Sequence, residues 1–487
     1  MRKLIVGFAA GLALLAGILT VRALTLRSKQ LQVAAVPRSV TNPIPLAERL
    51  AAAVRIRTVS NQETAAMDAE QFAAFPHYLE QTFPRVHASL QRETVGGYSL
   101  LFVWPGSSPD AAKPVLLMGH YDTVPVEPES EAAWTHPPFA GAIDGGFVWG
   151  RGTLDDKAGV LGTLEAVEML LGEGFRPKRT VYLAFGHDEE IGGQAGAEAI
   201  AALLGDRGVE LDLVLDEGGA IVSGFLPGSD GPVATIGIGE KGYVSVELAV
   251  ETAGGHSSIP PAETAIGILS AAITRLQAHP LPASLDAFIR HSLDYIGPET
   301  PFLFRLALAN LWLFGPIVEA QLSKAPATNA FLRTTTAPTI LRAGLKDNVL
   351  PGSATGVVNF RILPGETVDT VLEHVRATVG DQRVRIRALP FPNGPSPLSP
   401  AEGPVFTLLQ RTIGEVFPGA IVTPSLVLGA TDSRHYTRLS KHVYRFLPIR
   451  LGPDDLQRIH GTNERIGVED YGAVVEFYAR LLRNAAG

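Results

Sequence analysis

A series of short apolar segments, each followed within a few residues by acids or a histidine, constrains the fold of this chain most. Brief apolar runs bounded by turn residues are typical of buried strands. Segments with helical spacing separate them, such as 160–171. This alternation predicts an α/β fold with a mainly parallel sheet and right-handed crossovers. The runs and the polar residues after them are Pro114–Met118 with His120 and Asp122, Phe147–Trp149 with Asp155, Thr180–Phe185 with Glu189 and Glu190, and Leu211–Leu215 with Asp216 and Glu217.

The polar residues after these strands are candidate metal ligands, because open α/β sheets bind ligands at the carboxyl ends of their strands. Asp155 alone would be read as a helix cap, and Glu189 with Glu190 as a solvated acidic loop. Clustered acids repel one another unless a cation lies among them. The chain has no cysteine, so any metal must be held by His, Asp and Glu.

A second histidine ligand is expected in the last part of the chain, where His435, His442 and His460 are available. His460 is the best candidate, because it lies in a polar loop after a predicted strand. Two histidines and three carboxylates suit two zinc ions that share one carboxylate and one bridging water. Two metals ~3.5–4 Å apart lower the pKa of that water towards ~7 and polarise an amide carbonyl.

The domain organisation follows from a change in pattern after residue 240. Residues 243–250 alternate polar and apolar, as in a half-solvated antiparallel strand. The order strand, helix, strands, helix, strand to residue 388 predicts an inserted ferredoxin-like α+β unit. We therefore expect an α/β domain in two parts, 41–240 and 390–487, with the inserted unit at 241–389.

An apolar, poorly patterned stretch interrupts the inserted unit between Leu281 and Pro326. The favoured interpretation is that it forms extra helices packed on the core of that unit, the lid core.

The amino terminus, residues 1–40, is predicted to be a hydrophobic anchor or signal segment followed by a polar tether. Leu4 to Val21 is uncharged over 18 residues, close to the ~20 that span a bilayer, and basic residues flank it. Cleavage after Ala23 would make it a signal peptide. Either case predicts a membrane-anchored or exported protein, not a freely cytosolic one. The net charge of -8 gives no indication of nucleic-acid binding.

The motifs together resemble the zinc metallopeptidase family of aminoacylase, carboxypeptidase S, glutamate carboxypeptidase and succinyl-diaminopimelate desuccinylase. The resemblance covers nearly everything from Thr41 to Gly487 and implies a di-zinc hydrolase. Its catalytic domain would be 41–240 with 390–487, and the inserted unit, 241–389, would be a lid or dimerisation domain. By resemblance to relatives that act on N-fatty-acyl amino acids, the alternative for the stretch from Leu281 to Pro326 is that it lines an acyl groove or contacts a membrane. The motifs that carry it are Gly-His120-Tyr-Asp122-Thr-Val-Pro, Gly150-Arg-Gly-Thr-Leu-Asp155-Asp-Lys, His187-Asp-Glu189-Glu190, Leu215-Asp216-Glu217-Gly-Gly and Ile459-His460-Gly.

The resemblance also implies a role for each residue. His120, Glu190, His460 and one of the Asp216–Glu217 pair are terminal ligands, and Asp216 is favoured. Asp155 bridges the two ions, Glu189 is the general base and Asp122 orients His120. His256 stabilises the oxyanion, reaching across to a partner subunit of a homodimer. Arg361 and Asn348 hold the carboxylate end of the substrate, and Gly429 belongs to a substrate loop. An ordinary exposed arginine remains the alternative for Arg361.

The expected activity is cleavage of an amide or peptide bond next to an amino acid with a free carboxylate, as in the carboxypeptidase S branch. The Asp-Glu-Gly-Gly form, the long lid and the N-terminal segment point to that branch. The substrates implied are small peptides or N-acyl amino acids, including N-fatty-acyl amino acids, in hydrolysis or synthesis. A non-catalytic, membrane-tethered binding protein is a remote alternative, since the set of acids and histidines is intact. A serine hydrolase is disfavoured by the absence of a Gly-x-Ser-x-Gly motif.

Overall fold

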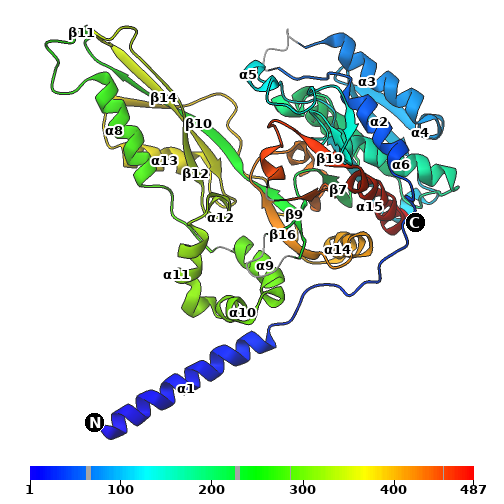
Figure 1. The fold of residues 1–487 in the computed structure, drawn as a ribbon, viewed down its shortest axis with the longest axis horizontal. Coiled ribbons are helices and arrows are strands. Elements are labelled where there is room, and N and C mark those ends of the chain that lie inside the picture. The colour runs from blue at the N-terminus through cyan, green and yellow to red at the C-terminus, as the bar shows by residue number, and fades with distance from the viewer. Residues whose placement is uncertain (62–66, 225–230, 286, 453) are drawn as a thin grey trace.

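The computed structural model describes residues 1–61, 67–224, 231–285, 287–452 and 454–487. A large α/β domain, a smaller antiparallel domain, a group of helices between them and a protruding N-terminal helix are separate in Figure 1. The predicted α/β class with an inserted α+β unit is therefore confirmed.

The large domain is built on a ten-stranded mixed sheet whose central strands are parallel. In sheet order the strands are β1 (Gln91–Val95), β2 (Ser99–Trp104), β6 (Val181–Gly186), β3 (Val115–His120), β7 (Leu213–Asp216), β17 (Val443–Arg445), β9 (Val233–Glu240), β8 (Ile221–Val222) and β18 (Arg450–Leu451), and β16 (Ile421–Val427) pairs with β9. β3 runs parallel to β6 and to β7, so their carboxyl ends share one edge. This edge carries the predicted ligands.

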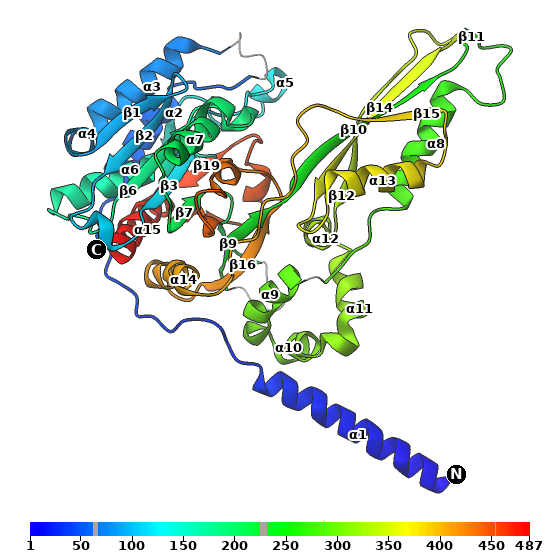
Figure 2. The ribbon, with the colours of Figure 1, turned by 180° about the vertical axis from the view of Figure 1, so that it is seen from behind.

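Both faces of this sheet are covered, which explains why its strands are continuously apolar. Along β3, Val115 and Leu117 join the core under the larger helical layer, whereas Leu116 and Met118 join the core on the opposite face. The larger layer contains α2 (Ile44–Val54), α3 (Ala69–Thr82), α6 (Lys157–Gly172), α14 (Pro404–Val416) and α15 (Val468–Ala486), and α7 (Ala199–Asp206) lies on the opposite face (Figure 2). α3 continues through Pro76, which lies inside the helix.

The smaller domain has the strand order of a ferredoxin-like fold. Its antiparallel sheet is ordered β12 (Thr335–Ala343), β14 (Ser353–Ile362), β10 (Gly242–Glu251) and β15 (Val384–Ala388), and α8 (Ala265–Ala278) and α13 (Val368–Val379) pack on it. Only Lys241 separates β9 of the large domain from β10 of the lid. Its buried ammonium donates to the carbonyl oxygens of Ala330 and Arg333, which fixes the junction to the inserted helices.

The apolar insertion forms α9 (Ala287–Ile296), α10 (Phe302–Ala309), α11 (Leu311–Leu322) and α12 (Pro326–Leu332). The favoured interpretation that these helices pack on the lid core is wrong. α9 lies against β16, where Ser292 Oγ donates to Pro424 O at 2.7 Å, and Phe288 and Tyr295 belong to the core of the large domain. The insertion therefore belongs structurally to the catalytic side, although the sequence places it inside the lid.

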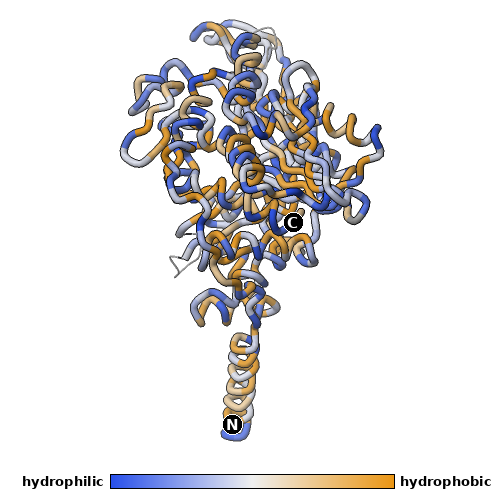
Figure 3. The backbone as a smooth tube through the Cα atoms, turned by 90° about the vertical axis from the view of Figure 1, so that its right-hand side faces the viewer, coloured by the Kyte–Doolittle hydropathy of each residue, from blue (hydrophilic) through white to orange (hydrophobic). Residues whose placement is uncertain are grey.

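The N-terminal helix α1 (Arg2–Thr25) projects away from the folded body as an apolar rod (Figure 3). It is long and apolar enough to cross a membrane. α10 and α11 pass the same test only if taken as one span, and they are bent by 115° at their junction. The following segment is not a loose tether. Gln30 Nε2 donates to Val422 O at 2.9 Å, and Val36 N donates to Glu415 O at 3.0 Å.

Candidate metal centre

Three predicted ligands converge at the carboxyl edge of the central strands. His120 ends β3, Asp155 precedes α6, and Glu190 lies in the 3-10 turn Glu189–Ile191 after β6. One ligand atom from each lies within 4.8 Å of the others. His460 joins them from the last part of the chain, with Nε2 3.4 Å from Glu190 Oε2.

Asp155 occupies the centre of the cluster. Its Oδ1 lies 2.8 Å from His120 Nε2, and its Oδ2 lies 2.9 Å from His460 Nε2. One carboxylate thus presents its two oxygens to two different histidines. Burial alone would raise the pKa of Asp155, but the hydrogen bonds to His120 and His460 hold it below its ordinary value. The same contacts raise the pKa of His460 to about 10.

Asp122 positions three groups at once and is fully buried. Its Oδ1 lies 3.2 Å from His120 Nδ1, which fixes the outer nitrogen of that ring. The backbone amides of Glu189 and Glu190 each donate to this carboxylate at 3.2 Å, and Ser60 Oγ donates at 2.6 Å. Asp122 therefore sets the place of the His120 ring and of the turn that carries the two glutamates.

The environment of Glu189 suits a group that must accept and release a proton. Burial raises the pKa of Glu189 well above its ordinary value; His120 opposes this shift, and Asp432, Glu190 and Asp155 add to it. Asp432 is itself buried, and neither of its carboxylate oxygens has a hydrogen-bond partner among the described residues. Asp432 belongs to the segment interpreted from the sequence as the substrate loop of Gly429, where it was given no role of its own.

The two acids at the end of β7 face different surroundings. Asp216 Oδ2 accepts from the backbone amide of Ser433 at 2.9 Å. Glu217 lines a cavity together with Asp155, and burial and the charge of Asp155 raise its pKa well above the ordinary value. Successive side chains at a strand end point in opposite directions. The geometry therefore favours Glu217 as the residue facing the metal cluster, against the preference for Asp216.

A buried ion pair that the sequence did not reveal connects two ligand loops. Arg151 Nη1 donates to Glu464 Oε2 at 2.6 Å, and Arg151 Nη2 donates to His460 O at 3.0 Å. Glu464 Oε1 accepts from the amide of Leu154, next to Asp155. His460 has a left-handed backbone with φ of 61°, which is uncommon for a residue other than glycine. Arg151 lies in a quoted motif and Glu464 follows His460 by four residues, but nothing in the sequence paired them.

The predicted substrate-binding residues divide into two groups. Gly429 lines the cavity that Asp155 and Glu217 also line. Arg361 lies at the base of the lid, with its guanidinium 5.0 Å from the centre of the Tyr243 ring, and burial lowers its pKa. β11 (Gly255–His256) lies at the tip of the lid, far from the catalytic domain (Figures 1 and 2). His256 and Asn348 are exposed there, and the carbonyl of Asn348 accepts from the amide of Ser257. This chain alone does not bring His256 or Asn348 to the metal cluster.

The donor set fits divalent cations on chemical grounds. It consists of two imidazoles and several buried carboxylates, with no thiolate. Asp155 and Glu190 are unfavourable neighbours without a positive charge between them. Burial and the charge of Asp155 raise the pKa of Glu190 and of Glu217, which opposes the ionisation of both acids. Imidazole and carboxylate together are typical ligands of zinc.

Comparison with known proteins gives consistent matches along the chain. A model of peptidase family M20/M25/M40 matches residues 116–484. Probable carboxypeptidase S-like 2 of Dictyostelium discoideum is 41% identical, covering 91% of this chain and 85% of that protein. The N-fatty-acyl-amino acid synthase/hydrolase PM20D1 of Homo sapiens is 42% identical, covering 91% of this chain and 88% of that protein. Carboxypeptidase S of Saccharomyces cerevisiae is 34% identical, covering 90% and 83%.

Solved structures show the same fold at low sequence identity. The M20 family metallo-carboxypeptidase Sso-CP2 of Sulfolobus solfataricus aligns with a TM-score of 0.66 at 18% identity, covering 90% of this chain and 98% of that one. Human carnosine dipeptidase 1 aligns with a TM-score of 0.63 at 16% identity, covering 91% and 96%.

Proposed function

The chain belongs to peptidase family M20/M25/M40 and is a metallohydrolase, and from this premise we propose that it uses two zinc ions to hydrolyse the amide bond of an N-acyl amino acid or small peptide with a free carboxylate. The observation that carries the two-ion proposal is Asp155, whose two oxygens each meet a different histidine. A shared carboxylate of this kind is what a pair of neighbouring ions requires.

We propose that His120 and Glu217 hold one ion, that Glu190 and His460 hold the other, and that Asp155 bridges them. Glu217 replaces Asp216 in this assignment, because Asp216 is engaged by the Ser433 amide. Ions held in this way would lower the pKa of a water molecule and polarise the amide carbonyl.

Glu189 is the proposed general base. It takes the proton of the attacking water and delivers it to the nitrogen of the leaving amine, and the amide C–N bond breaks. The raised pKa of Glu189 supports this role, since a carboxylate that binds protons more tightly is better matched to neutral pH. Asp122 keeps Glu189 in place through the backbone amide of that residue.

Arg361 is proposed to bind the substrate carboxylate when the lid closes, because its half-buried guanidinium lies over the Tyr243 ring and is in none of the ion pairs among the described residues. His256 and Asn348 would act from the lid of a second copy, which agrees with their exposed position at its tip. A membrane-anchored or exported location is proposed. α1 would be retained as an anchor in the first case and would serve as the export signal in the second.

The test is Glu189→Gln in zinc-loaded protein, assayed with N-acyl amino acids and with carboxybenzoyl-dipeptides. We expect kcat to fall ~10²–10⁴-fold, because general acid–base catalysis contributes about that much. Zinc content by elemental analysis should stay at two ions per chain. Glu198→Gln, an exposed acid eight residues from Glu190, is the matched control and should leave kcat unchanged.

Near-wild-type turnover by Glu189→Gln with zinc retained would overturn the assignment of the base. A wild-type chain that binds zinc and cleaves neither substrate class would overturn the proposed function.

A further inference from the structure

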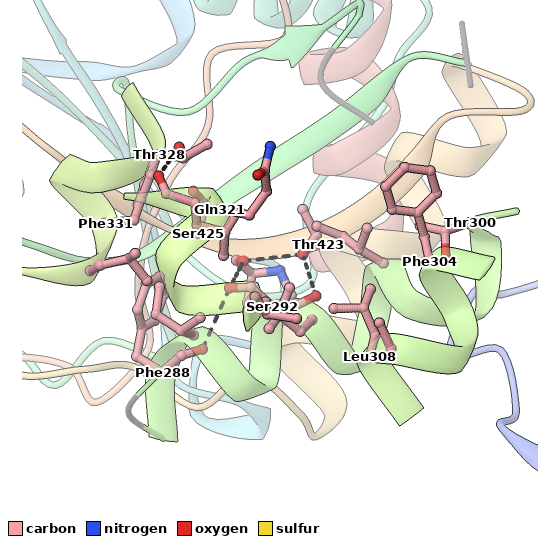
Figure 4. A pocket seen from close by; sticks show the side chains of 18 of the residues that line it. Phe288, Ser292, Thr300, Phe304, Leu308, Gln321, Thr328, Phe331, Thr423 and Ser425 are labelled. Carbon is pink, nitrogen blue, oxygen red and sulfur yellow. Dashed lines mark hydrogen bonds between the residues drawn. The ribbon is translucent and has the colours of Figure 1, made fainter. Parts of the chain in front are cut away.

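A second cavity lies between the inserted helices and the strands β9 and β16. It has a volume of about 360 Å³ and is enclosed by α9, α10, α11 and α12 on one side and by β9 and β16 on the other. Figure 4 shows its side chains, with Phe304 and Leu308 on α10, Phe288 and Ser292 on α9, and Phe331 on α12. A cavity of this size is within the ~300–1,000 Å³ of small-molecule sites.

The lining is chemically a hydrocarbon surface. None of the described residues that line it carries a charge. Most of its hydroxyl groups donate within the protein: Ser292 Oγ donates to Pro424 O and Thr300 Oγ1 to Gly297 O, each at 2.7 Å, and Thr328 Oγ1 donates to Leu322 O. A bound group would find few free donors, so a chain of methylenes is the ligand that loses least on entry.

This cavity adjoins the cavity at the metal centre. That neighbouring cavity has a volume of about 570 Å³ and is lined by Asp155 and Glu217. Three residues, Thr235, Phe331 and Ser425, line both cavities. The two spaces are therefore adjacent, and these three side chains lie at their boundary.

The outer end lies beside the N-terminal helix. Phe304 and Ile317 line the cavity and are 46% and 66% exposed. α1 packs against this part of the insertion: Arg22 Nε donates to Ala309 O at 3.2 Å, and Asn310 Nδ2 donates to Leu19 O at 3.1 Å. The mouth between α10 and α11 is thus held next to the proposed membrane anchor.

We propose that this cavity holds the straight acyl chain of an N-acyl amino acid, with the amide at the metal centre and the chain end towards the mouth between α10 and α11. The proposal rests on the proposed function and names its substrate class. The adjacency of this cavity to the cavity at the metal centre favours an acyl chain attached to the scissile amide over an unrelated lipid. The insertion, and not the lid, then determines preference for acyl-chain length.

Substitution of a lining residue tests the proposal in the full-length, zinc-loaded chain. N-acyl amino acids with one constant amino acid and acetyl, octanoyl or hexadecanoyl groups serve as substrates. For the wild type, kcat/KM should rise by up to about fourfold per methylene, the equivalent of ~0.8 kcal/mol for each one buried. Ala307→Trp, which fills the cavity from α10, should lower kcat/KM for the hexadecanoyl substrate at least tenfold and leave the acetyl substrate within twofold.

Leu303→Trp is the matched control, because Leu303 is an exposed apolar residue on the same helix that does not line the cavity. It should behave as the wild type with all three substrates. Val318→Trp fills the cavity from α11 and gives a second test if Ala307→Trp fails to fold. Binding of palmitate, measured by displacement of a fluorescent fatty acid, should weaken in both filling variants and gives a readout that needs no turnover.

Equal kcat/KM for all three acyl lengths, or filling variants that keep the long-chain preference and palmitate affinity, would overturn the proposal while hydrolysis of the acetyl substrate still supports the proposed function. Absence of hydrolysis at every chain length would count against the proposed function instead, and palmitate binding would then decide the proposal alone.

Discussion

At the scale of single residues, Asp155 and Asp122 together determine how the histidines and glutamates of the metal cluster are arranged. Asp155 offers one oxygen to each histidine, and Asp122 fixes one histidine and the backbone of both glutamates. Removing either carboxylate would disturb several groups at once. Arg151 and Glu464 extend this organisation, because they join the loop of His460 to the loop of Asp155.

The choice between Glu217 and Asp216 can be tested by metal content. Glu217→Gln should lower the bound zinc from two ions to about one per chain, because a neutral amide is a poor zinc ligand. Asp216→Asn, the matched control, should retain two ions, since Asp216 accepts a hydrogen bond from Ser433 and faces away from the cluster. Elemental analysis after dialysis makes the measurement. Loss of zinc in Asp216→Asn alone would restore Asp216 as the ligand.

The sequence identified the cluster well because its ligands follow strands with clear apolar patterns. His120, Asp155, Glu190 and His460 were each predicted, and the structure brings all four together. The register of the Asp216–Glu217 pair was not predictable, because adjacent acids differ only in the direction of the side chain. The partnership of Arg151 with Glu464 depends on tertiary packing across 313 positions and has no local signal.

At the scale of secondary-structure elements, α14 and α15 are held together by a nearly buried carboxylate. Glu415 accepts from Arg480 Nε at 2.6 Å, Asn484 Nδ2 at 2.8 Å and Arg411 Nε at 2.9 Å. Burial opposes ionisation, but these three donors lower the pKa of Glu415 to about 2. The pKa of Glu415 in the folded protein lies below its ordinary value of 4.5. The stabilisation is therefore complete above pH 4.5 and is lost as the pH falls towards 2.

Glu415→Gln should therefore lower the free energy of unfolding by about 1–3 kcal/mol at pH 7, and the difference from the wild type should shrink towards pH 3. Thermal unfolding at both pH values measures it. Glu93→Gln breaks a more exposed pair with Arg207 and should cost less than about 1 kcal/mol. A penalty for Glu415→Gln that is equal at pH 7 and pH 3 would contradict the electrostatic explanation.

Elements with clear periodicity were predicted with nearly correct bounds: residues 160–171 lie within α6, 243–250 within β10 and 180–185 almost coincide with β6. The insertion was placed wrongly, because an apolar helix surface shows that it is buried but not which partner buries it. α9 packs on β16, which follows it by more than 120 residues, whereas α8, the helix before it in the sequence, belongs to the lid.

At the scale of the whole molecule, the metal centre, the apolar cavity and the N-terminal helix follow one another in space. The central sheet presents the ligands, the insertion covers the back of β9 and β16, and α1 packs on α10 (Figures 1 and 3). The lid projects in another direction, joined through Lys241. The lid and the insertion can therefore act on different ends of one substrate.

Membrane attachment through α1 can be tested with liposomes. Replacing Leu12 and Leu14, both exposed on α1, with arginine should release the chain from phosphatidylcholine vesicles in a co-sedimentation assay, because each charge at a helix centre costs ~2.5–3.5 kcal/mol in a membrane. Hydrolysis of an acetyl substrate in solution should stay unchanged. Leu12→Ile with Leu14→Ile is the control. Vesicle binding by the arginine variant would show that another surface attaches the protein.

The segment that follows α1 has a consequence for maturation of the protein. Gln410 Nε2 donates to Lys29 O, and the amides of Ser39 and Val40 donate to Glu476, so this extended segment is bound along the catalytic domain. A peptidase that removed α1 at Ala23 would leave these bonds intact. A shed form and an anchored form would then share one catalytic geometry and differ only in where they diffuse: one through the surrounding fluid, the other within the plane of a bilayer.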